Sequence, residues 1–159
     1  MNPRLVRAAA FGIGAVAGLR SLLAPAVLTW VAHKKFVDRT FPLAAVVSRP
    51  VSKKIIKLAA AELLADKLPF TPNRISPGPL AVRIASGVAC GAAVSLVARE
   101  SAKEGALLGG AGALVGAFGG YYARKTFRRT YPDVAVALVE DALAVALAVG
   151  ISRQVTHRI

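Results

Sequence analysis

The sequence predicts an all-α integral membrane protein with a single domain. Hydrophobic residues make up 55% of its 159 residues and charged residues only 18%. Soluble domains of this size seldom combine so little charge with long apolar runs. These runs are rich in Ala, Val, Leu and Gly, and small residues allow membrane helices to pack closely.

Four apolar runs each have about the 20 residues that a helix needs to cross about 30 Å of hydrocarbon. We predict that all four are transmembrane helices of one domain, 1–159. Arg20 and Pro25 interrupt the first run, and Arg83 lies near the start of the second. The four runs are about 8–32, 80–98, 105–123 and 134–151.

A shorter segment, 55–68, ends before Pro69 and reaches only about 21 Å as a helix. On such a helix Glu62 and Asp66 share a side with apolar residues, and lysines occupy the opposite side. We predict a short amphipathic or re-entrant helix whose lysines face lipid head groups and whose acids point into the protein. Alternatively, the two acids pair with nearby bases such as Arg74.

The 21 basic residues outnumber the 8 acidic ones, give a net charge of +13, and lie mostly between the apolar runs. This distribution favours loops beside the anionic head groups of a bilayer, most simply the bacterial inner membrane. It argues against nucleic acid, which would require a continuous basic face. With 55–68 not crossing, the positive-inside bias places loops 33–79 and 124–133 in the cytoplasm and both termini outside. The start, "MNPRLVR", resembles the first part of a signal peptide and keeps a five-crossing arrangement open.

Two basic loops resemble each other and indicate an internal repeat. "AHKKFVDRTFP" (32–42) and "ARKTFRRTYP" (123–132) each follow an apolar run and precede a helix that carries acids. Duplicated or inverted halves are common in transporters. Chance similarity between short basic loops remains the alternative.

Three ionisable residues lie near the middle of apolar runs: Arg20 in the first, and Glu140 and Asp141 in the fourth. Because a charge at the bilayer centre costs about 2.5–3.5 kcal/mol by insertion scales, we predict that Arg20 pairs with one of the two acids. The remaining carboxylate would then be protonated, hydrated or bound to a cation. It could serve a proton or metal pathway or a contact with a neighbouring subunit. The candidate intramembrane charge site is Arg20, Glu62, Asp66, Glu140 and Asp141.

Glycines recur at four-residue spacing in three runs, which predicts close helix packing. We expect the ridge in the third run, at Gly112 and Gly116, to form a homo-oligomer, most simply a dimer. The predicted helix-packing glycines are Gly14, Gly18, Gly87, Gly91, Gly105, Gly109, Gly112, Gly116 and Gly120.

The residues that could support catalysis or bind a cofactor are few. Cys90 is the only cysteine and lies in an apolar run, while His33 and His157 are far apart. We find no phosphate-binding loop, nucleophile elbow or Ser–His–acid set. We therefore expect neither an enzyme nor a cofactor, and the sequence leaves metal binding undecided.

Several segments in order along the chain resemble the bacterial integral-membrane family known as domain of unknown function 4126. They are "GLRSLLAPAVLTW" (18–30), "AELLADKLPFTPNR" (61–74), "RIASGVACGA" (83–92), the glycine-rich third run, and "VEDALA" (139–144). The resemblance implies a small multi-pass membrane protein and carries no activity.

Two functions remain open at this point. In the first, the protein moves a cation or a proton-coupled small solute past the buried acids, with Arg20 as counter-charge. In the second, it is a structural or accessory membrane subunit whose buried charges fix helix packing. The first requires a cavity or water beside the acids, and the second requires direct salt bridges in a dry core.

Overall fold

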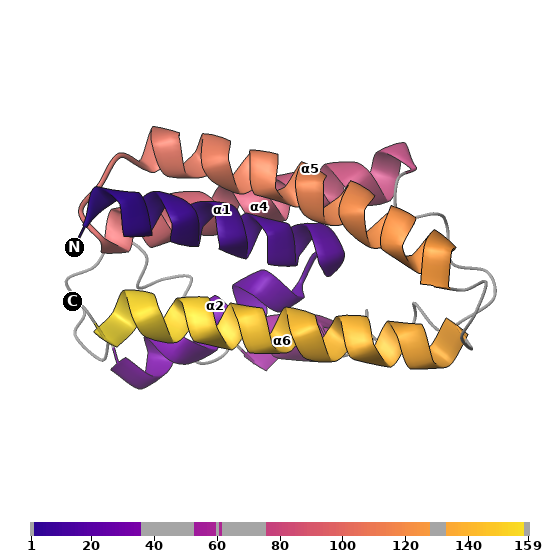
Figure 1. Ribbon diagram of the computed structural model, residues 1–159. Coiled ribbons are helices and arrows are strands. Elements are labelled where there is room, and N and C mark those ends of the chain that lie inside the picture. The colour runs from indigo at the N-terminus through magenta and orange to yellow at the C-terminus, as the bar shows by residue number, and fades with distance from the viewer. Residues whose placement is uncertain (1, 36–52, 60, 62–75, 128–132, 158–159) are drawn as a thin grey trace.

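The computed structural model describes residues 2–35, 53–59, 61, 76–127 and 133–157, and within this part of the chain the secondary structure is helical with no strand. The helices are α1 (Pro3–Leu19), α2 (Leu23–Lys35), α4 (Pro77–Val97), α5 (Ala102–Phe127) and α6 (Asp133–His157). They lie roughly along one direction, and both ends of the chain are at the same end of the bundle (Figure 1).

Local signals explain where several helices begin and end. Asn2 caps α1 by accepting a hydrogen bond from the Arg4 amide, and Pro3 occupies the first turn, where no donor is lost. Pro77 likewise starts α4. After α4, Arg99 adopts a positive φ of 58°, and the Glu100 amide bonds the Ser95 carbonyl at 2.8 Å. This is a Schellman turn with arginine at the position where glycine is usual.

Within the part of the chain that the structure describes, three helices are long and apolar enough to cross a membrane: Pro77–Val97, Ala102–Phe127 and Ala135–Gln154. Large apolar side chains on their outer faces are exposed, including Leu107 at 75% and Val139 at 61%. Such exposure is costly in water but suits lipid. These helices indicate a membrane protein and agree with the second, third and fourth predicted runs.

The first predicted run, 8–32, is not one helix. It breaks at Arg20, Ser21 and Leu22, which we call the break, and α2 turns back toward the end that holds both termini (Figure 1). Gly12 of α1 lies against Ile151 of α6, whereas Arg20 lies against Asp141, so α1 runs antiparallel to α6. The α1–α2 pair is therefore a helical hairpin with its tip inside the bundle.

Much of the predicted short helix 55–68 lies outside the described residues. Residues 53–59 are helical; Lys53 and Lys57 are exposed, and Ala59 is 6% exposed. Leu58 is also exposed, at 55%, so these residues do not separate a lysine side from an apolar side, and the amphipathic or re-entrant helix stays a prediction. Most of the two similar loops also lies outside the described residues, but α2 and α5, which precede them, end at opposite ends of the bundle (Figure 1).

Glycines bring α1, α4 and α5 into backbone contact, and we call this interface the seam. A Cβ atom on Gly14 would overlap the Gly109 carbonyl, and one on Gly109 would overlap the Gly87 carbonyl. Gly18, Gly91 and Gly105 meet backbone from a neighbouring helix in the same way, and Gly120 is buried. A second cluster joins α1 to α2, α4 and α6 through residues such as Ile13, Leu23, Val94 and Ala148.

The glycine ridge of the third run packs within the chain and not against a second copy. A Cβ atom on Gly112 would overlap the Phe11 carbonyl, and one on Gly116 the Ala15 carbonyl, both on α1. The predicted oligomer interface at these two glycines is therefore wrong, because α1 already covers them. Self-association stays a prediction without this ridge to support it.

Candidate intramembrane charge site

The break exposes backbone groups in the interior of the bundle. The last residue of α1 is Leu19, and Arg20 leaves the helix in an extended conformation with φ −142° and ψ 109°. The final carbonyls of a helix have no partner within it, and they carry the negative end of the helix dipole. Positive donors are therefore needed at this point.

Arg20 pairs with an acid of the fourth run, and the acid is Asp141. Its Nε donates to Oδ1 of Asp141 at 2.7 Å, and a terminal guanidinium nitrogen lies 2.5 Å from the same oxygen. The Arg20 side chain is 1% exposed and that of Asp141 15%. A buried pair of this kind offsets the cost of taking both charges out of water, provided that neither partner is removed.

Arg83 of α4 binds the open end of α1. One guanidinium nitrogen donates to the Gly18 carbonyl at 2.8 Å and to the Leu19 carbonyl at 2.6 Å. Ser86, one turn further along α4, donates its hydroxyl to the Ser21 carbonyl at 2.5 Å. Both donors are on the same face of α4, so this helix satisfies three carbonyls around the break.

Arg83 is the functional residue that sequence reasoning noted without assigning it a role. Its side chain is 3% exposed, so it is a second buried cation at the break. The sequence analysis counted two acids, Glu140 and Asp141, against Arg20 alone and therefore predicted a surplus carboxylate. Arg83 adds a second buried cation, so the count of buried charges near the break is two arginines and two acids, of which Arg20 and Asp141 are in direct contact. The sequence signal for a role of Arg83 was its position within an apolar run. The carbonyls to which Arg83 donates, those of Gly18 and Leu19, are open only because α1 ends there.

Glu140 occupies a different environment from its neighbour Asp141. It lines a cavity of about 260 Å³ between α5 and α6, together with Leu19, Gly120 and Arg124. Its carboxylate oxygen Oε2 is itself buried. The cavity therefore contacts Glu140 without opening onto its whole carboxylate.

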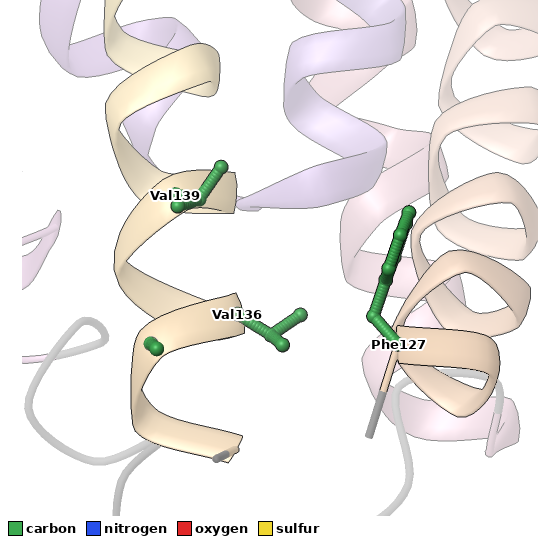
Figure 2. A pocket seen from close by; sticks show the side chains of 4 residues that line it. Phe127, Val136 and Val139 are labelled. Carbon is green, nitrogen blue, oxygen red and sulfur yellow. The ribbon is translucent and has the colours of Figure 1, made fainter. Parts of the chain in front are cut away.

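A second cavity of about 270 Å³ adjoins the first, and its lining is entirely apolar: Phe127, Ala135, Val136 and Val139. In Figure 2 the Val136 side chain points from α6 toward Phe127 on α5. We call the two cavities together the groove. Apolar walls of this extent suit hydrocarbon better than a hydrated ion.

Two of the predicted site residues, Glu62 and Asp66, lie outside the described residues. The structure thus brings together Arg20 and Asp141, with Glu140 beside them. Among the described residues no group of three or more His, Cys, Asp or Glu side chains could hold a metal ion.

No family model, curated protein or solved structure matches this chain. The resemblance to the integral-membrane family stays a prediction.

Proposed function

We propose that the protein is a structural or accessory subunit of the bacterial inner membrane, without transport or catalytic activity of its own. The observation that supports this proposal best is the direct contact between Arg20 and Asp141 at 2.5 Å, made by side chains that are 1% and 15% exposed. Direct pairing leaves no room for an ion or a water molecule between the two charges. The buried charges then hold a helical hairpin in place.

In this proposal α4, α5 and α6 cross the membrane, and α1 and α2 form a re-entrant hairpin. The tip at Arg20 is level with Asp141, which lies about 12 Å along α6 from its start at 1.5 Å per residue. The hairpin thus enters from the face that holds both termini and stops short of the other face. In this arrangement the end of α2 and the start of α4 lie at opposite faces of the membrane (Figure 1).

Cysteine labelling tests this arrangement. Single cysteines at Lys35 and at Ser76, in a variant with Cys90→Ser, should react with an impermeant maleimide from opposite sides of the membrane. A cysteine at Lys103 should react from the same side as the one at Lys35. If Lys35 and Ser76 react from the same side, the first run crosses completely and the re-entrant hairpin is wrong.

A flux assay tests the absence of transport. Purified protein in liposomes with an internal pH dye should give no proton or alkali-cation flux above that of protein-free liposomes, with or without an imposed potential. Flux in the wild type that is lost in Glu140→Gln and kept in Glu104→Gln would overturn the proposal. Glu104 is a suitable control because it pairs with Arg7 at an exposed position outside the groove.

That same outcome would establish the second candidate, movement of a cation or a proton-coupled small solute. One observation favours it: Glu140 lines a cavity, whereas Asp141 is held by Arg20. In this alternative Glu140 alone exchanges the proton or cation, and the Arg20–Asp141 pair is fixed. The buried Oε2 of Glu140 and the apolar walls weigh against it.

A further inference from the structure

The groove between α5 and α6 opens at the depth of the membrane and has a basic rim. Its apolar wall is formed by the last turn of α5 and the first half of α6, including Phe127, Val136 and Val139. Val139 is 61% exposed and Phe127 52%. With α5 and α6 crossing the membrane, as proposed above, these exposed apolar side chains contact the hydrocarbon of the bilayer.

The rim carries positive charge at the end of α5. Arg124 lines the inner cavity, and both Arg124 and Lys125 belong to the last turn of the helix. Basic residues that lie between transmembrane helices at the membrane surface attract anionic head groups. The rim and the wall together therefore match an amphiphile with a negative head and an apolar tail.

We infer that the groove binds one anionic phospholipid of the surrounding bilayer, with its head group at Arg124 and an acyl chain that runs inward along Val139 and Leu143. This lipid would fill the space where α5 and α6 diverge and would link the two helices. The groove continues into the exposed apolar face of α6, which includes Leu143 at 57% exposure. The acyl chain of the lipid can therefore enter the groove sideways from the membrane. A small cation is the other occupant that Glu140 would allow.

The test uses the full-length protein, delipidated in maltoside detergent, with phosphatidylglycerol or phosphatidylcholine of identical acyl chains added. Native mass spectrometry measures how much of each lipid stays bound. We expect phosphatidylglycerol to bind at least about fivefold more tightly, since one basic residue near the membrane surface contributes about a factor of five. Arg124→Gln should reduce this preference about fivefold and leave phosphatidylcholine unaffected, whereas Arg153→Gln, on α6 near the C-terminus, should change neither.

Filling the groove is the second part of the test. Val139→Trp should reduce binding of both lipids at least tenfold, and so should Leu143→Trp, which guards against a variant that fails to fold. Leu147→Trp is the matched control, because Leu147 is 53% exposed on the same helix and lines neither cavity.

Three results would overturn the inference. The first is equal retention of the two lipids by the wild type. The second is undiminished binding by folded Val139→Trp and Leu143→Trp. The third is a wild type that retains neither lipid but retains tetraphenylphosphonium, with that retention lost in Glu140→Gln, which would identify a cation as the occupant.

Discussion

The two sides of α5 pack differently against their neighbouring helices. Toward α1 and α4, at the seam, glycines let backbone meet backbone, as where Gly109 lies against Gly14 and Gly87. Toward α6, contacts are few, and Phe127 and Val139 line the groove between the two helices. Lipid offers no hydrophobic drive for helix association, so close contact has to come from small residues and specific polar bonds. Where the facing side chains are larger, as at Phe127 and Val139, a cavity remains between the helices.

The largest expected effect comes from adding a side chain at the seam, where the helix backbones are in contact. Gly109→Leu places a side chain where only backbone fits, and neither neighbouring backbone can move aside. We expect a loss of more than about 5 kcal/mol in the free energy of unfolding, which is exceptional for one substitution. A loss of this size should appear as a low yield from detergent extracts and as an aggregated or absent peak in size-exclusion chromatography.

The matched control is Gly119→Leu on the groove side of the same helix, where an added Cβ meets nothing within 4 Å. It should fold normally. If the two variants are equally damaged, the comparison between the two sides of α5 is wrong.

The next effect in size concerns the pair at the break. Arg20→Ala leaves Asp141 buried without its partner and should cost about 3–5 kcal/mol. Arg20→Ala with Asp141→Ala should recover part of this loss, whereas Arg20→Ala with Glu140→Ala should recover less, because Arg20 contacts Asp141. Melting temperatures in detergent of the singles and doubles measure the coupling.

Arg7→Ala is the control for the pair, since its bridge to Glu104 is exposed and should contribute less than about 1 kcal/mol. Strictly additive losses for Arg20 and Asp141 would show that their contact contributes nothing.

A smaller loss is expected at Arg83, which donates to the carbonyls of Gly18 and Leu19. Arg83→Met keeps the apolar stem but removes the donors to Gly18 and Leu19, so it should cost about 2–3 kcal/mol. Arg83→Lys should recover part of that loss by keeping a donor and a charge at the end of α1. Thermal unfolding in detergent compares the variants, and a Met variant as stable as wild type would refute the capping role.

The smallest expected effect lies in the turn between α4 and α5. Arg99→Gly should stabilise the protein by about 1 kcal/mol, because a positive φ costs a residue with a Cβ about that much and costs glycine nothing. Arg99→Ala keeps the Cβ and should give no gain. A rise in melting temperature for both variants would mean that the arginine side chain, and not its backbone, is unfavourable there.

The sequence predicted the interactions that depend on a single residue type at a regular spacing. Four-residue glycine spacing predicted close packing, and an arginine in an apolar run predicted an acid as its partner. The break was missed because Arg20 and Pro25 were treated as interruptions of one long helix. Pro25 is the third residue of α2, and proline is tolerated in a first turn, so it could have indicated a new helix start.

What the sequence could not predict depends on how the chain is arranged in space. Gly112 and Gly116 predicted a close contact but not that α1 of the same chain would form it. Arg83 has backbone partners that exist only because α1 stops at Leu19. The groove arises from the divergence of α5 and α6, which no local pattern encodes.

The partner of Arg20 is made 121 residues later in the chain. At about 5–20 residues per second, a ribosome needs on the order of ten seconds to reach it. During that interval an arginine deep in hydrocarbon would have no carboxylate beside it. We therefore expect the α1–α2 hairpin to wait at the membrane surface or beside the insertion machinery until α6 emerges, so that α6 completes the insertion of a hairpin made well before it.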